Sequence, residues 1–140
     1  MKSHVAILRR EYADLLLAGT KTIESRLSRV RGPAFGKVFT GDSVFIKQSS
    51  GPFIARATVS EVLHRLIQSP QELDDIRTQF DHAIIGTDEY WRSKIGSRYC
   101  SLIWLADFTT QFTPPHYRRW RGFSPRAAWI VGPTRRLTNG

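Results

Sequence analysis

The sequence predicts a single α+β domain, with helices beside a curved or closed sheet. Its 140 residues match the usual size of one domain, and 41% apolar with 24% charged residues is ordinary for a globular protein. Strand-like and helical patterns are mixed along the chain and joined by turns, and neither a repeat nor a low-complexity linker divides it. We therefore treat residues 1–140 as one domain.

The first part of the chain predicts a strand, a helix and a second strand. Residues 5–8 form a short apolar run that is typical of a buried strand. Apolar residues at helical spacing in residues 10–18 end at Gly19, and glycine often ends a helix because it adopts the left-handed conformation without steric cost. Residues 22–27 alternate between polar and apolar side chains, which indicates a half-buried strand.

A long connection separates this strand from a predicted hairpin. The connection, residues 28–40, exceeds the usual ~4–6 residues, so it is either a functional loop or a simple surface excursion. The hairpin strands, residues 43–47 and 53–59, are joined by the turn Ser49-Ser50-Gly51-Pro52. We expect these strands to be antiparallel neighbours, with the second continuing toward Leu63.

Two capped helices and an aromatic strand follow the hairpin. Ser69-Pro70-Gln71-Glu72 is a capping box, with serine at the N-cap, proline at the first helical position and glutamate at the third. The apolar stripe of this helix is Leu73, Ile76 and Phe80. Residues 87–91 predict a second capped helix that ends near Gly96, and residues 99–112 predict a long strand region. Pro114-Pro115 then breaks regular structure.

The charge distribution favours an anionic, planar partner. The chain has 21 Lys plus Arg against 12 Asp plus Glu, a net charge of +9, and 16 of the basic residues are Arg. A guanidinium group binds phosphate as a fork and stacks on bases. A GC-rich genome also produces many arginines whatever the function, so placement is more informative than composition. Residues 113–140 contain six Arg and no acidic residue, whereas most of the acidic residues lie in 61–89.

Charged side chains gather where the first helix gives way to the second strand. Glu24 and Arg26 are two residues apart on a strand and therefore share a face, opposite Ile23 and Leu27, which would face the core. Lys21 lies at the junction, where the adjacent helix C-terminus stabilises its charged form. An amine and a guanidinium can hold an oxyanion while a carboxylate accepts a proton. The alternative is a surface ion pair between Glu24 and Arg26.

Rings and arginines alternate in residues 116–123. The run contains Tyr117, Arg118, Arg119, Trp120 and Arg121. Proteins that bind single-stranded nucleic acid commonly stack rings on bases while cations follow the phosphates. The alternative is a structural cation–π contact in a loop that closes the sheet.

Other kinds of chemistry are not indicated. The four His are widely spread and there is one Cys, so we predict no metal site and no cofactor. Cys100 lies in an apolar run and reads as a buried thiol rather than a nucleophile. No apolar run reaches the length of a signal peptide or the ~20 residues of a membrane helix, so we expect a cytoplasmic protein without a membrane partner.

Residues 16–26 resemble the GxKxxExR signature of the ASCH family, a branch of the PUA-like folds. All four signature positions match, as Gly19, Lys21, Glu24 and Arg26. The order of elements around the signature is also similar to that family, and the resemblance covers residues 4–112.

This resemblance implies a PUA-like small mixed β-barrel flanked by helices, with a cleft that takes RNA or a modified nucleotide. Some ASCH proteins are similar to an amidohydrolase that removes the acetyl group of N4-acetylcytidine, and others act on single-stranded RNA. The amidohydrolase uses Lys, Thr and Glu together. Lys21 matches its lysine, Glu24 occupies the threonine position, and its second carboxylate has no sure counterpart in residues 81–88. Thr22, Ser25 or Ser49 could supply the hydroxyl.

Two functional hypotheses follow. The first is a binding module for single-stranded RNA or a modified nucleotide, and its contact residues would be Arg26, Arg29, Lys47, Tyr117, Arg118, Arg119, Trp120 and Arg121. The second is a hydrolase, either a ribonuclease or a nucleoside amidohydrolase, in which Lys21 stabilises negative charge and Glu24 is the general base. A protein-interaction domain with a basic face ranks last because it makes no use of the signature.

Overall fold

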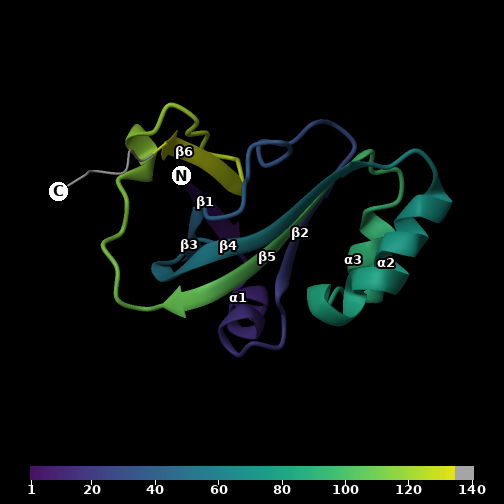
Figure 1. Ribbon diagram of the computed structural model, residues 1–140, viewed down its shortest axis with the longest axis horizontal. Helices are drawn as coiled ribbons and strands as arrows, with labels where there is room; N and C mark the ends of the chain where they lie inside the picture. The colour runs from purple at the N-terminus through teal and green to yellow at the C-terminus, as the bar shows by residue number, and fades with distance from the viewer. Residues whose placement is uncertain (135–140) are drawn as a thin grey trace.

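A curled six-stranded sheet forms the centre of the protein, as the computed structural model in Figure 1 shows. The structure describes residues 1–134. The elements in chain order are β1 (Lys2–Leu8), α1 (Arg10–Leu17), β2 (Ile23–Ser28), β3 (Ser43–Gln48), β4 (Phe53–Leu66), α2 (Pro70–Ile84), α3 (Asp88–Ser93), β5 (Tyr99–Thr109), the 3-10 turn η1 (Tyr117–Arg119) and β6 (Trp129–Thr134). The strand order is β2-β5-β4-β3-β1-β6, in which β1 and β3 are parallel and the other neighbours are antiparallel. The predicted α+β fold with a mixed, curved sheet is confirmed.

Side-chain caps fix where the two later helices begin. The Ser69 hydroxyl accepts a hydrogen bond from the Glu72 amide at 3.3 Å, and the Glu72 carboxylate accepts one from the Gln68 amide at 2.8 Å. The predicted capping box is therefore confirmed. In α3, the Thr87 hydroxyl accepts from the Tyr90 amide at 3.0 Å. Each cap satisfies a backbone donor that the helix itself leaves without a partner.

The last strand differs from the sequence prediction. The sequence predicts a break at Pro114-Pro115 and a basic aromatic segment over residues 113–140, of which 135–140 lie outside the described residues, and it assigns no strand there. In the structure β6 pairs with β1 along one edge of the sheet. The strand contains Gly132, where an added Cβ would lie 2.6 Å from the Ser3 carbonyl oxygen and 2.7 Å from the Trp120 ring. A glycine required by this close approach hides the alternating pattern that would otherwise predict a strand.

Three buried clusters hold the layers together. The first lies between one face of the sheet and α1, the second packs α2 and α3 against β2 and β5, and the third packs against the segment that contains η1. Cys100 belongs to the second cluster, and burial raises the pKa of its thiol to about 12. This confirms the interpretation of Cys100 as a core residue, because the thiol stays protonated at neutral pH.

The long connection between β2 and β3 is anchored to the sheet by His64 of β4. The Gly36 amide donates to Nδ1 of His64 at 3.2 Å, and Nε2 lies 2.9 Å from the Val38 carbonyl oxygen. A backbone amide can only donate and a carbonyl can only accept, so both bonds require the neutral ring that carries its proton on Nε2. The connection is therefore a fixed part of the fold.

A chain of buried hydrogen bonds joins β1, the start of β3 and β6. Nε2 of His4 lies 2.8 Å from Oδ2 of Asp42, and the Trp129 indole donates to Nδ1 of His4 at 3.2 Å. Burial lowers the pKa of the His4 imidazole, and the bond to Asp42 offsets this only in part. Burial alone would raise the pKa of Asp42, but its hydrogen bonds to His4 and to the backbone amides of Lys2 and Phe39 lower it.

The stability of the protein should fall as the pH drops below about 6.5, the ordinary pKa of histidine. His4 stays neutral in the folded state while an unfolded histidine takes up a proton, so the unfolded state binds more protons. The free energy of unfolding should then decrease by up to about 1.4 kcal/mol per pH unit, as measured by urea unfolding between pH 5 and 8. The His4→Gln variant should show a flatter dependence, whereas His116→Gln, at an exposed position, should not. Equal slopes in all three proteins would contradict the assignment.

Candidate functional site

A cleft with a volume of about 960 Å³ lies against β2. Its walls come from β2, α3, the loop at residues 32–35, the end of β3 with its turn at 47–50, and the segment at 117–129. These parts are far apart in the chain and are brought together by the sheet order, which places β2 and β6 at opposite edges of a curled sheet. The cleft is thus formed by the tertiary fold rather than by one loop.

Glu24 and Arg26 line this cleft on the strand face that the sequence predicted. Glu24 is only 7% exposed, and its Oε1 lies 3.9 Å from Nε of Arg26, too far for a hydrogen bond. Oε2 of Glu24, and Nε and Nη2 of Arg26, are buried and have no hydrogen-bond partner in the described part of the chain. A buried polar atom without a partner costs about 1–3 kcal/mol, so a ligand that supplied these partners would gain affinity.

The indole of Trp129 supports Arg26. The central guanidinium carbon of Arg26 lies 5.3 Å from the ring centroid of Trp129, within the range of a cation–π contact. Trp129 is itself held by the hydrogen bond to His4. The guanidinium plane is therefore positioned by a fully buried network that begins at Asp42.

Helix α3 contributes a second wall through Tyr90 and Lys94. The Tyr90 hydroxyl lies 2.5 Å from the Ser25 hydroxyl on β2, and burial raises the pKa of the Tyr90 phenol although this hydrogen bond opposes the shift. The Lys94 ammonium lies 5.4 Å from the centre of the Tyr90 ring. Burial, and then the positive charge of Arg26, lower the pKa of Lys94. The Ser25–Tyr90 bond joins α3 to β2 at the cleft.

Lys21 lies behind the cleft wall rather than in it. Its side chain is buried, and Nζ donates a hydrogen bond of 2.6 Å to the Ile84 carbonyl at the end of α2. Burial lowers the pKa of the Lys21 ammonium, and the nearby Glu24 carboxylate acts in the opposite direction. Lys21 is not among the residues that line the cleft. In this arrangement its ammonium connects α2 to the start of β2.

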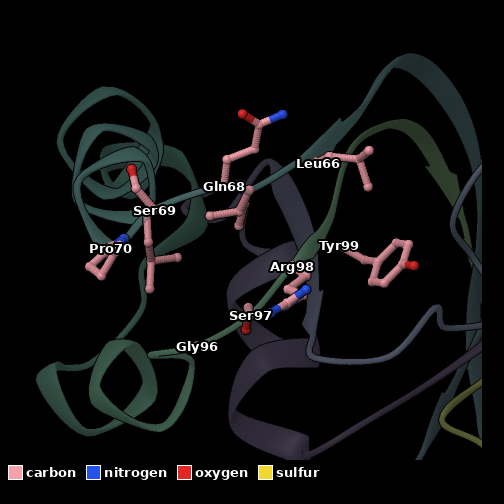
Figure 2. Close-up of a pocket in the computed structure, with 10 residues that line it drawn as sticks. Leu66, Gln68, Ser69, Pro70, Gly96, Ser97, Arg98 and Tyr99 are labelled. Carbon is pink, nitrogen blue, oxygen red and sulfur yellow. The ribbon is translucent and has the colours of Figure 1, made fainter.

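A second hollow, shown in Figure 2, lies at another place in the fold. It has a volume of about 530 Å³ and lies between the end of β4, the start of α2 and the residues before β5. Leu66, Gln68, Pro70 and Arg98 are among the residues around it. It contains no residue of the signature and none of the predicted binding residues, so we place the candidate site at the larger cleft.

Comparison with known proteins identifies the fold. No protein-family model and no curated protein matches the sequence. Among solved structures, the chain is similar to the ASCH protein of Zymomonas mobilis, with a TM-score of 0.64 and 17% identity over 92% of this chain and 86% of that one. A tyrosine-to-phenylalanine variant of the same protein matches with a TM-score of 0.65 and 17% identity over 93% of this chain and 89% of that one.

The chain has the ASCH fold. The resemblance drawn from the GxKxxExR residues is thereby confirmed at the level of the fold. In this ASCH fold, Gly19 has a φ of 78° and takes the left-handed conformation at the turn after α1, as the sequence predicted. Glu24 and Arg26 of the signature line the cleft, whereas Lys21 supports the wall from behind.

Three further residues predicted to bind nucleic acid also lie at the cleft of this ASCH fold. Lys47 comes from the end of β3, and Tyr117 and Arg118 come from η1. The Tyr117 ring packs edge-on against Phe53 and Phe123, which fixes the position of η1 on the sheet. The structure thus brings part of the basic aromatic segment to the signature.

The other four predicted residues lie outside the cleft wall. Arg29 extends toward the loop before β5, where its Nη2 donates to the Ile95 carbonyl at 3.4 Å. The Trp120 ring packs over Gly132 within the third buried cluster. Arg119 and Arg121 are exposed and do not line the cleft. A 3-10 turn points successive side chains in different directions, so only some of this run faces the cleft.

The sequence analysis missed several residues at this site. They are Arg9, Tyr12, Phe35, Tyr90, Lys94, Tyr99, Arg126 and Trp129. None belongs to a motif with fixed spacing, and Tyr90 meets Ser25 across 65 residues of sequence. The one usable signal was the capped helix start at Thr87, which predicted α3 but not the direction in which Tyr90 points.

Within residues 1–134, no three His, Cys, Asp or Glu side chains come together as metal ligands would. In the same part of the chain, no helix is both long enough and apolar enough to cross a membrane.

Proposed function

We propose that the protein binds single-stranded RNA, or a modified nucleotide, in the cleft beside β2. One observation carries this proposal. Glu24 and Arg26 have buried polar atoms without a hydrogen-bond partner, and basic and aromatic side chains line the same cleft. The polar edges of an RNA base can form hydrogen bonds with Glu24 and Arg26. The phosphates and the faces of the bases can contact the basic and aromatic side chains.

The size and walls of the cleft suit an unstacked base. Its volume of about 960 Å³ lies within the range of ligand sites, which is roughly 300–1,000 Å³. Rings of Tyr12, Phe35, Tyr90 and Tyr99 are among its walls. Stacking of a base on an aromatic side chain contributes about 1–3 kcal/mol and tolerates any base.

The rim of the cleft supplies positive charge for phosphates. Arg9, Lys47, Arg118 and Arg126 come from four separate segments and all line the cleft. The net charge of +9 adds a long-range attraction for a polyanion. A strand whose base enters the cleft would therefore find cations on several sides for its flanking phosphates.

Arg118→Gln should weaken binding to a short single-stranded RNA and make it less dependent on salt. Each phosphate contact to a single strand contributes a slope of about −0.7 to the plot of log affinity against log salt, so the variant should lose about one such contact. Fluorescence anisotropy between 50 and 300 mM salt measures both effects. The matched control is Arg119→Gln, because Arg119 is adjacent and exposed but lies outside the cleft. Equal losses in both variants, or affinity of the wild type that does not change with salt, would contradict the proposal.

Hydrolysis at the same site is the second candidate function. Its support is the burial of Lys21 beside Glu24, because burial lowers the pKa of the ammonium and strengthens its electrostatic effect on a nearby reacting group. In this proposal Glu24 takes a proton from the attacking water and Lys21 stabilises the negative charge that develops. Binding ranks first because the Lys21 ammonium already donates to the Ile84 carbonyl and does not line the cleft.

If the protein is a hydrolase, Lys21→Gln should reduce turnover by about 10²–10³, the usual effect of removing one charge-stabilising donor. The assay incubates the protein with N4-acetylcytidine and, separately, with single-stranded RNA, and identifies products by mass. Lys37→Gln is the control, since the Lys37 side chain is exposed and Lys37 does not line the cleft. Unchanged turnover in Lys21→Gln would remove Lys21 from the chemistry. Absence of product with the wild type would leave binding as the function.

A further inference from the structure

The second hollow combines apolar walls with one charged side chain. Leu66, Ile67, Pro70 and Leu73 supply apolar surface, and within residues 1–134 Arg98 is the only charged residue that lines the hollow. Leu66 is 54% exposed, so part of this apolar surface is left uncovered. The volume of about 530 Å³ lies within the range of ligand sites, roughly 300–1,000 Å³. The hollow is therefore large enough for a small ligand with an apolar body.

Ser97 gives the hollow a polar group that lacks a partner. The residue lines the hollow and is only 6% exposed. Its hydroxyl forms no hydrogen bond within residues 1–134, yet it is not one of the unpartnered atoms that are closed off from solvent. The hydroxyl is therefore accessible from the hollow, and a ligand that supplied its missing partner would gain affinity.

Two arginines bring positive charge to the same place. The side chain of Arg98 is exposed, and its guanidinium forms no ion pair, hydrogen bond or ring contact in the described part of the chain. Arg29 lies at the border of the hollow, where its Nη2 donates to the Ile95 carbonyl at 3.4 Å. An added Cβ at Gly96, which lines the hollow, would lie 3.2 Å from Nε of Arg29. An arginine without a protein partner readily binds an anion.

The N-terminus of α2 adds to this attraction. Figure 2 shows Ser69 and Pro70, at the start of α2, on one side of the hollow and Arg98 on the other. The backbone amides at the N-terminus of this 15-residue helix give that end a partial positive charge. Glu72 is the one acidic residue of the first turn, and its carboxylate accepts from the Gln68 amide and does not line the hollow. Both sides of the hollow therefore favour a negatively charged group.

We infer that this hollow binds an apolar monocarboxylate, either the C-terminus of a peptide that ends in an aliphatic residue or a free aliphatic acid. The carboxylate accepts hydrogen bonds from the Arg98 guanidinium and the Ser97 hydroxyl, and the aliphatic part covers Leu66 and Leu73. Inorganic phosphate fits less well, because it has no apolar part to cover these walls. Apart from Tyr99, no residue lines both this hollow and the cleft beside β2, so the two sites can be tested separately.

NMR titration of the whole protein with a matched pair of probes tests this inference. The probes are N-acetyl-leucine and N-acetyl-leucinamide, which share the apolar body but differ in charge. The amide signals of Ser97 and Arg98 should shift with the acid, and the acid should bind about tenfold or more tightly than the amide, because charge-assisted hydrogen bonds are the stronger ones. Equal affinities, or acid binding that leaves Ser97 and Arg98 unshifted, would overturn the inference.

Two further probes identify the source of the carboxylate. Hexanoate that binds as well as N-acetyl-leucine supports the site and assigns it to a free acid, whereas binding of N-acetyl-leucine alone supports it and assigns it to a peptide C-terminus. Tighter binding of inorganic phosphate than of either acid would overturn the inference. RNA that shifts Ser25 but not Ser97 would uphold the proposed function whatever the acids do, so the two can fail independently.

Substitutions test the two residues named. Arg98→Gln should lower the affinity for N-acetyl-leucine about tenfold, close to that of the uncharged amide. Ser97→Ala should lower it about threefold to tenfold, the effect of one hydrogen bond. Arg92→Gln is the matched control, since Arg92 is an exposed arginine of α3 that does not line the hollow. An undiminished preference for the acid in Arg98→Gln would overturn the assignment, and the comparison of probes on the wild type decides the ligand even if Ser97→Ala fails to fold.

Discussion

The structure depends on the buried hydrogen-bond chain from Asp42 through His4 to Trp129. It joins the segment before β3, the strand β1 and the edge strand β6, which lie next to one another in the sheet. His4 is fully buried, so each of its ring nitrogens must find a partner. The neutral ring donates to Asp42 and accepts from the indole, and a second proton would place two donors against each other. The hydrogen-bond chain therefore holds Trp129 in place only while the His4 imidazole is neutral.

The geometry of the cleft depends on this chain of hydrogen bonds. Trp129 supports Arg26, and Arg26 lies beside Glu24 without forming a hydrogen bond to it. Two opposite charges left this close and unsatisfied are poor stabilising elements, because removal from water costs more than a loose ion pair returns. Such an arrangement is typical of a site that a ligand completes. Basic side chains and the rings of Tyr90 and Tyr117 line the same cleft, and this is the combination that the proposed RNA binding requires.

The sequence predicted the fold well wherever the signal was local. The cap at Ser69, the turn at Gly51 and the glycine after α1 each act within a few residues, and all were found in the structure. The shared face of Glu24 and Arg26 followed from strand alternation. The features that the sequence did not predict depend on contacts between segments that are distant in the chain. No local pattern places Tyr90 against Ser25 or turns Arg118 toward the cleft and Arg119 away from it.

The most direct test of this account is where a ligand contacts the protein in solution. The four tryptophans of the chain give indole signals in a nitrogen–proton NMR spectrum, and a Trp→Phe variant of each assigns them. On titration with a short single-stranded RNA, we expect the Trp129 indole and the Ser25 amide to shift together, while the indoles of Trp104 and Trp120 stay in place. Shifts confined to residues 119–121 and the Trp120 indole, with Trp129 and Ser25 unchanged, would show that RNA binds the basic segment outside the cleft and would contradict binding in the cleft.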